Sequence, residues 1–226
     1  MSDAAARLED VSYRYPGADA FALRVPALRV DRGELVACVG ASGCGKTTLI
    51  NLMAGVLVPD SGWVTLGEVP ISDLPEARRR VERIRRVGLV FQEFELLEYL
   101  SAFHNIVLPF RLSGALGSVA SVRGRVRELA GSLGVSHVLG RRPGRLSQGE
   151  RQRVAVCRAL VTGPELIIAD EPTGNLDPGN ADGVIDLLIE SARASGAAML
   201  VVTHNHKLLD RFDRVIHLDD LTGAGS

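Results

Sequence analysis

The sequence has no long apolar run, and this absence limits the classes of protein to which the chain can belong. Across its 226 residues, no apolar stretch approaches the roughly 18 residues that a membrane-spanning helix requires. The first seven residues also lack the apolar core of a signal peptide. We therefore expect a chain that neither crosses a bilayer nor carries a secretion signal.

The sequence also lacks an excess of charge of either sign. It contains 26 lysines and arginines against 27 aspartates and glutamates, which gives a formal net charge of −1 at pH 7. Such a chain has no positive field with which to attract nucleic acid, so we expect no nucleic-acid partner. The sequence has three cysteines, Cys38, Cys44 and Cys157, and an odd number this small does not form a disulfide framework. The odd count and the thiol in the glycine-rich stretch indicate a reducing, cytoplasmic location.

What the sequence does contain is a glycine-rich stretch between two apolar segments. Leu35–Val39 is typical of a buried parallel strand, and Leu49–Met53 is apolar at helical spacing. A strand, a glycine-rich turn and a Gly-Lys-Thr sequence that opens a helix form the context of a phosphate-binding loop. The residues of this loop are Gly40, Ala41, Ser42, Gly43, Cys44, Gly45, Lys46, Thr47 and Thr48.

The chemistry of this loop predicts that the chain binds a nucleoside triphosphate. Glycines let backbone N–H groups approach phosphate oxygens without a clash from a Cβ atom, and the new helix adds unpaired N–H groups and a positive dipole end. Lys46 can reach the β- and γ-phosphates, and the Thr47 hydroxyl can ligate Mg²⁺. Cys44 is either a reactive thiol or an inert small residue, and both interpretations stay open.

Two further apolar strands end in residues that can act on the phosphates. Glu165–Glu171 indicates a buried strand that ends in two acids, and carboxylates at a strand's carboxyl end lie beside the phosphate loop in such sheets. Asp170 can hold Mg²⁺ through water, and Glu171 can face the γ-phosphate. His204 follows the predicted strand Ala198–Thr203 and is either a structural histidine or part of the same site.

Three other residues allow two interpretations each from the sequence alone. Tyr13 and Tyr15 share one face of a predicted strand over Val11–Tyr15, where an aromatic ring either stacks on an adenine base or covers the sheet. Gln92 follows the predicted strand Val87–Phe91. It is either an ordinary loop residue or a ligand for Mg²⁺ or the attacking water.

The region from about residue 93 to residue 162 differs in character from the rest, and we expect a mostly helical insertion there. One amphipathic helix is predicted over Val119–Leu133 and another over Arg151–Val161. Ser147 and Glu150 have the spacing of a capping box, in which each side chain bonds the backbone of the other at a helix start.

The remaining elements are predicted from their local pattern. A basic helix is expected over Pro75–Arg86, with Arg78–Arg80 facing solvent. Asp177 and Pro178 resemble an N-cap followed by a proline at the first helical position. The chain is expected to close with a strand over Arg214–Leu218 and a short polar tail.

In this order, the motifs resemble the ATPase subunit of an ABC transporter, over nearly the whole chain. The matching segments are Gly40–Thr48, Gln92, Leu146–Glu150 followed by Arg151–Ala155, Leu166–Glu171 and His204. Two finer features resemble one subgroup: Glu171–Asp177, and Phe91–Gln92 with Asn105–Pro109 downstream. That subgroup includes the lipoprotein-releasing, macrolide-export and glycolipid-export ATPases and the cell-division ABC ATPase.

The resemblance implies a role for each matching position on the chain's own nucleotide. Tyr15 matches the aromatic residue that stacks on adenine. Lys46 and the loop amides hold the phosphates, while Thr47 and Gln92 ligate Mg²⁺. Glu171 is the general base that polarises the attacking water.

The resemblance also implies residues that act at contacts with other molecules or switch with the nucleotide. His204 is the switch residue that contacts the γ-phosphate. Ser147 and Gly149 match the signature that binds ATP held by a second subunit, with Asp177 across the interface. The segment Gln92–Leu100 matches the groove that receives a helix of the membrane-spanning partner.

The implied fold is α/β, a P-loop NTPase of the ABC ATPase type. It has a mostly parallel core sheet, an N-terminal antiparallel β subdomain and an inserted helical subdomain. One domain is expected over residues 1–226, with residues 1–92 and 163–226 in the sheet-containing core and residues 93–162 in the helical signature subdomain.

Three positions depart from the family pattern. Gln148 and Glu150 replace a glycine and the glutamine of the usual Leu-Ser-Gly-Gly-Gln signature. Asn205 stands where the family often has an aspartate after the switch histidine. We expect Gln148 and Glu150 to affect the affinity of dimer closure, and Asn205 to affect the orientation of the loop that carries His204.

Two functions are compatible with this family resemblance, and both use ATP and Mg²⁺ as cofactors. In the first, ATP hydrolysis by a pair of ATPase subunits drives a permease that exports or extracts a lipid-linked or hydrophobic substrate or a drug. In the second, ATP-driven closure is a mechanical switch that signals through a membrane partner without transport. In either case the chain is expected on the cytoplasmic face of the inner membrane. A small P-loop kinase is excluded because it has no use for the Ser147 signature.

Overall fold

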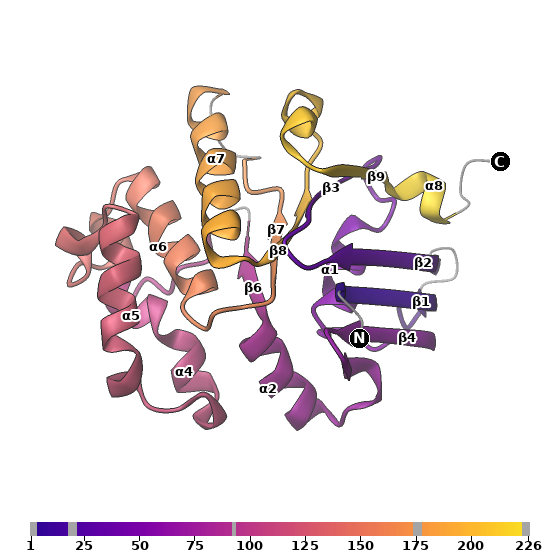
Figure 1. Cartoon of the computed structure of the whole chain (residues 1–226), viewed down its shortest axis with the longest axis horizontal. Coiled ribbons are helices and arrows are strands. Elements are labelled where there is room, and N and C mark those ends of the chain that lie inside the picture. The colour runs from indigo at the N-terminus through magenta and orange to yellow at the C-terminus, as the bar shows by residue number, and fades with distance from the viewer. Residues whose placement is uncertain (1–3, 18–21, 92–93, 174–177, 223–226) are drawn as a thin grey trace.

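The computed structural model describes residues 4–17, 22–91, 94–173 and 178–222, whose strands form two sheets (Figure 1). The first sheet is antiparallel and has the strand order β2-β1-β4-β5. The second sheet is parallel and has the order β6-β7-β8-β3-β9. The strands are β1 (Ala4–Arg14), β2 (Ala22–Asp31), β3 (Leu35–Val39), β4 (Ser61–Leu66), β5 (Val69–Pro70), β6 (Val87–Val90), β7 (Leu166–Asp170), β8 (Ala198–Val202) and β9 (Arg214–His217).

The parallel sheet is buried on both faces, which explains its continuous apolar sequences. All five residues of β3 and all five of β8 are buried. Alternate side chains of β3 enter different cores: Val36 and Cys38 pack with the antiparallel sheet and α1 (Lys46–Met53), whereas Leu35 and Ala37 pack with α7 (Pro178–Ser195). The α/β fold expected from the sequence is confirmed.

Helices make up most of the region between β6 and β7. They are α3 (Ala102–Ile106), α4 (Leu108–Leu112), α5 (Val119–Ser132) and α6 (Gln148–Leu160). Val122, Val126 and Ala130 of α5 pack with Val154 and Cys157 of α6 in a third apolar core. Because this core is made by residues of the segment itself, the inserted helices form their own packed layer beside the parallel sheet (Figure 1).

One expectation about solvent exposure was wrong. Arg79 of α2 (Glu76–Arg86) is buried, because its guanidinium donates to the Leu74 carbonyl at 2.9 Å and pairs with Glu76. The last strand ends at His217, one residue before its expected end, and Leu218 begins the helix α8 (Leu218–Thr222). Leu218 is fully buried there and packs in the same apolar core as β3 and α1.

No helix in the described part of the chain combines the length and the apolar character of a membrane span.

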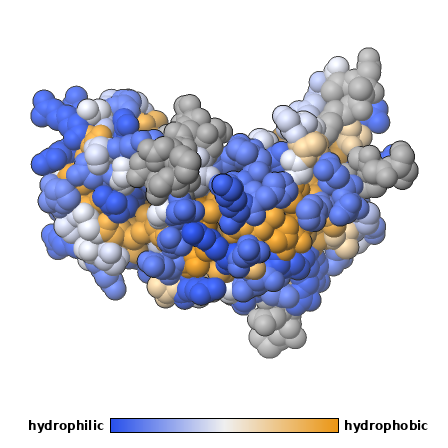
Figure 2. All heavy atoms as spheres, turned by 90° about the horizontal axis from the view of Figure 1, so that it is seen from above, coloured by the Kyte–Doolittle hydropathy of each residue, from blue (hydrophilic) through white to orange (hydrophobic). Residues whose placement is uncertain are grey.

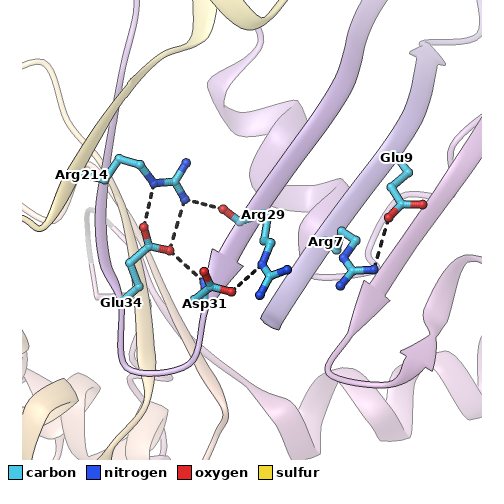
Figure 3. Close-up of polar contacts among 6 residues, drawn as sticks. All are labelled: Arg7, Glu9, Arg29, Asp31, Glu34 and Arg214. Atoms are coloured by element: carbon cyan, nitrogen blue, oxygen red, sulfur yellow. Dashed lines mark hydrogen bonds and ion pairs between the residues drawn. The ribbon is translucent and has the colours of Figure 1, made fainter. Parts of the chain in front are cut away.

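An ion-pair network ties β9 to the turn between the two sheets (Figure 3). The Arg214 guanidinium donates to Glu34 at 2.7 Å and also to the Arg29 carbonyl. Glu34 accepts in turn from the Asp31 N–H at 2.8 Å, and Asp31 pairs with the Arg29 side chain at 2.5 Å. The hydrogen bond to Glu34 raises the pKa of Arg214 above its ordinary value. Because these side chains are partly exposed, the network fixes the turn geometry more than it adds stability.

Gly88 of β6 approaches α6 so closely that its position predicts a test of this packing. A Cβ atom at Gly88 would lie 2.5 Å from the Ala159 carbonyl oxygen, a backbone atom that cannot turn aside. We expect Gly88→Ala to lower the free energy of unfolding by about 1–3 kcal/mol in urea titrations. Gly140→Ala is the control, because nothing lies within 4 Å of a Cβ atom there. Equal stability of the two variants would contradict the close packing of β6 on α6.

Candidate active site

The phosphate loop spans the gap between the end of β3 at Val39 and the start of α1 at Lys46. Gly43 and Gly45 have φ angles of 82° and 106°, values that residues with a Cβ atom rarely adopt. Gly45 is the N-cap residue of α1, and among the described residues no side chain caps the first turn of this helix. Its N–H groups are therefore available to an anion.

The Lys46 ammonium folds back over the loop. Its Nζ donates to the carbonyl oxygens of Gly40 and Ala41, both at 2.9 Å. On the other side of the same peptide, the Ala41 N–H donates to Asp219 of α8 at 3.4 Å. Sequence reasoning missed Asp219, because a lone acid near the carboxyl end of the chain gives no signal of its distant partner. Cys44 is half-buried and packs against the apolar core, which fits a structural role.

Asp170, the last residue of β7, lies beside the start of α1. Burial first, and then the neighbouring Glu171 carboxylate, raise the pKa of Asp170, while a hydrogen bond with the Thr47 side chain opposes this shift. A hydroxyl and a carboxylate at this spot fit Mg²⁺, which prefers oxygen ligands and takes the rest of its shell from phosphates and water. Gln92, the other expected ligand, lies outside the described residues, as does Asp177.

Glu171 and His204 lie together at the ends of β7 and β8. His204 Nδ1 is 3.3 Å from Glu171 Oε2, and the Glu171 N–H donates to the Val202 carbonyl at 2.9 Å. Glu171 has a φ of 43°, so its backbone is held in a sparsely populated conformation. Asn205 follows His204, and its side chain accepts from the Lys207 N–H at 3.1 Å, which caps the short helix His206–Arg211. This departure from the family pattern therefore has a local structural role.

Tyr13 and Tyr15 differ in exposure although they are two residues apart. Tyr13 is 9% exposed and belongs to the core, while Tyr15 lies just past the end of β1 and is 37% exposed. The Tyr15 hydroxyl is 3.3 Å from the Thr48 hydroxyl of α1, and its ring meets Tyr13 edge-on with centroids 5.0 Å apart. Tyr15 is thus the more exposed of the two tyrosines, and its hydroxyl lies next to the helix that follows the phosphate loop.

Ser147 and Glu150 form the predicted capping box at the start of α6. The Ser147 hydroxyl accepts from the Glu150 N–H at 3.2 Å, and Glu150 accepts from the Ser147 N–H at 2.7 Å. The second carboxylate oxygen of Glu150 lies 3.1 Å from Nε2 of His137. The Ser147 N–H is the largest of several partners that lower the pKa of Glu150. Both oxygens of Glu150 are therefore engaged within its own chain.

The structure brings one group of predicted residues together and keeps another apart. The strand ends carry Lys46, Thr47, Asp170, Glu171 and His204 to one edge of the parallel sheet. Figure 2 views the molecule from the top of Figure 1, and a band of hydrophobic residues crosses this face between hydrophilic borders. Helix α6, which Ser147 caps, lies to the left of the parallel sheet in Figure 1, whereas α1 lies to its right.

The chain is similar to known proteins in both sequence and structure. The sequence profile of the family described as ABC transporter matches residues 23–174. The lipoprotein-releasing system ATP-binding protein LolD of Cereibacter sphaeroides is 43% identical over 197 residues, which cover 87% of each chain. The dimeric structure of MJ0796, a bacterial ABC transporter cassette, has a TM-score of 0.79 at 30% identity and covers 94% of this chain and 93% of that chain. A post-hydrolysis structure of MJ0796, bound to ADP and Pi, has a TM-score of 0.76 at 28% identity, with 94% and 93% covered.

The lowered pKa of Glu150 predicts how the capping box responds to pH. A carboxylate with a lowered folded-state pKa adds stability above its unfolded pKa and loses that contribution as pH falls through the folded value. We expect Glu150→Gln to be less stable than the natural chain near neutral pH, and the difference to shrink on acidification. Urea unfolding from about pH 7 to about pH 4 measures this, with Glu128→Gln on the exposed face of α5 as the control. A difference that stays constant with pH would contradict the role of the ionised carboxylate.

Proposed function

We propose that this chain, which belongs to the ABC transporter family and is an ATPase of that family, powers a membrane partner that releases or exports a lipid-linked substrate. The observation that supports the substrate class is the 43% identity to a lipoprotein-releasing ATP-binding protein over 87% of both chains. In this proposal the chain lies at the cytoplasmic face of the inner membrane, where the partner holds it.

The proposed hydrolysis assigns one task to each residue at the strand ends. Tyr15 stacks on the adenine, and Lys46 with the N–H groups of the loop holds the phosphates. Thr47, Asp170 and Gln92 would hold Mg²⁺, which when bound would supply positive charge to the phosphates. The hydrogen bond between the Thr47 side chain and the Asp170 carboxylate supports this assignment, because it places two oxygen ligands together.

Glu171 is the proposed general base. Its carboxylate takes a proton from water while the water oxygen bonds to the γ-phosphorus and the bond to the ADP oxygen breaks, which yields ADP and phosphate. The 3.3 Å contact with His204 holds Glu171 at the end of β7, and the same histidine can reach the γ-phosphate when Glu171 faces water. A carboxylate fixed by its neighbours in this way loses little entropy on entering the reactive geometry.

Ser147 and Gly149 are proposed to complete the site of a second copy. In the same chain, α6 and α1 lie on opposite sides of the parallel sheet, so in this proposal Ser147 and Gly149 act at another chain's nucleotide. The solved dimer of the similar cassette MJ0796 supports a two-chain assembly. In this arrangement Asp177 lies across the interface, and the two ATP molecules are held between the chains.

An apolar groove beside α4 is the proposed docking site for the membrane partner. It has a volume of about 320 Å³, and Leu97, Leu108, Pro109 and Leu112 are among its lining residues. Leu112 is 59% exposed there, so it adds a large accessible apolar side chain to the groove, which a partner helix can cover. Residues 93–162 would then carry both the partner groove and the signature, and residues 1–92 and 163–226 would hold the nucleotide.

Removing the proposed base gives a direct test of the chemistry. Glu171→Gln keeps the size and hydrogen bonding of the side chain but cannot accept the water proton, so we expect turnover to fall by about 100-fold or more with ATP binding retained. With Mg²⁺ and ATP, the variant should elute as a dimer in size-exclusion chromatography, whereas the natural chain with ADP should elute as a monomer. Turnover at the natural rate would show that Glu171 is not the base.

The proposed substrate class needs a transport assay. The chain, with the membrane protein that co-purifies with it, is reconstituted into vesicles that carry an acylated lipoprotein. ATP should release the lipoprotein into solution, and Glu171→Gln should abolish that release. ATP turnover without release of the lipoprotein would contradict this function and favour the mechanical switch.

A further inference from the structure

The segment that follows Gln92 has an unusual backbone. Phe94 and Glu95 have φ angles of 61° and 41°, and they are the one adjacent pair of non-glycine residues with positive φ in the described chain. Each such residue costs free energy relative to an ordinary conformation, so a neighbouring group must hold it in place. The Phe94 N–H also donates to the Phe91 carbonyl at 3.0 Å, which joins the described residues on either side of Gln92.

Arg158 of α6 supplies the holding contact. Its guanidinium donates to the Phe94 carbonyl at 2.7 Å and to the Glu95 carbonyl at 2.6 Å. The arginine is half-buried, and burial lowers its pKa while the Glu95 carboxylate opposes this shift. A guanidinium in such a setting is stable only because it is hydrogen-bonded, and its planar fork is suited to two adjacent acceptors.

The position of Arg158 on α6 connects two parts of the proposed mechanism. Helix α6 has 13 residues and so spans about 20 Å, with Ser147 as its N-cap and Arg158 in its last turn. The close approach of Gly88 to Ala159 fixes this last turn against β6. Arg158 and Glu95 also line the apolar groove that we assign to the membrane partner.

We infer that Arg158 is a positioning residue that fixes Phe94 and Glu95 to the signature helix, and that this contact sets the Mg²⁺ dependence of ATP turnover. This inference rests on the proposed function, because Gln92 is the proposed Mg²⁺ ligand. A residue that merely fills space between α6 and the loop would affect stability and leave the metal dependence of turnover unchanged. The two roles therefore differ in a measurable property.

The test compares Arg158→Lys with three other variants of the full chain. Lysine keeps the charge, but its ammonium cannot present two parallel N–H groups to both carbonyls. Gln92→Ala removes the proposed ligand itself, and Arg127→Ala on the exposed face of α5 is the matched control for loss of an arginine. Arg158→Lys combined with Glu95→Gly places a residue that accepts positive φ at the strained position.

Two measurements are made on each variant. Hydrogen–deuterium exchange of the peptide covering residues 94–100, without nucleotide, reports directly on the clamp. The Mg²⁺ concentration that gives half-maximal ATP hydrolysis reports on the metal site. Loss of an outer contact that orients a ligand typically weakens metal binding by about tenfold, so we expect a shift of that order for Arg158→Lys. Exchange should also be faster, Arg127→Ala should match the natural chain, and Glu95→Gly should recover part of both effects.

The outcomes separate this inference from the function on which it rests. If Gln92→Ala raises the half-maximal Mg²⁺ concentration and a folded Arg158→Lys does not, the positioning role is wrong. Unchanged exchange in Arg158→Lys would likewise overturn the inference, because the clamp would then not hold the segment. If Gln92→Ala itself leaves the Mg²⁺ dependence unchanged, the proposed ligand is wrong, whereas faster exchange in Arg158→Lys would still establish the clamp.

Discussion

Parallel hydrogen bonding of β8 to both β3 and β7 is the constraint on which the rest of the molecule depends. Because all three strands run in one direction, their carboxyl ends meet at one edge, although they are far apart in the sequence. The phosphate loop follows β3, Asp170 and Glu171 end β7, and His204 follows β8. A reversal of one strand would carry its polar residue to the opposite edge of the sheet, away from the phosphates.

The second constraint is that α6 belongs to the inserted helices and yet touches the sheet. Its apolar face packs in the helical core, while its last turn lies against Gly88 of β6. A rigid helix held at one end can transmit a displacement to the other. In the proposed function this places Ser147, at the free end, at the nucleotide of a second chain, and Arg158, at the fixed end, at the partner groove.

Local signals made most of the elements predictable from the sequence, because strands, helix starts and the phosphate loop depend on neighbouring residues. The capping box of Ser147 and Glu150 is an example, since its two residues are three apart. Contacts between distant residues leave no such pattern. The burial of Arg79, the helix α8 with Asp219 at the phosphate loop, and the bonds from Arg158 to Phe94 and Glu95 depend on tertiary packing. The sequence therefore suggested the residues of the proposed site, and it gave no signal for the distant residues that contact them.

In the proposed assembly, two chains close head-to-tail, with Ser147 of each at the phosphate loop of the other. Disulfide cross-linking tests it most directly, with Ser42→Cys in one chain and Ser147→Cys in a second, both carrying Cys44→Ser and Glu171→Gln. We expect a cross-link between the two chains that forms with Mg²⁺ and ATP and not with ADP. A cross-link that forms equally with ADP, or none with ATP in a folded mixture, would contradict it.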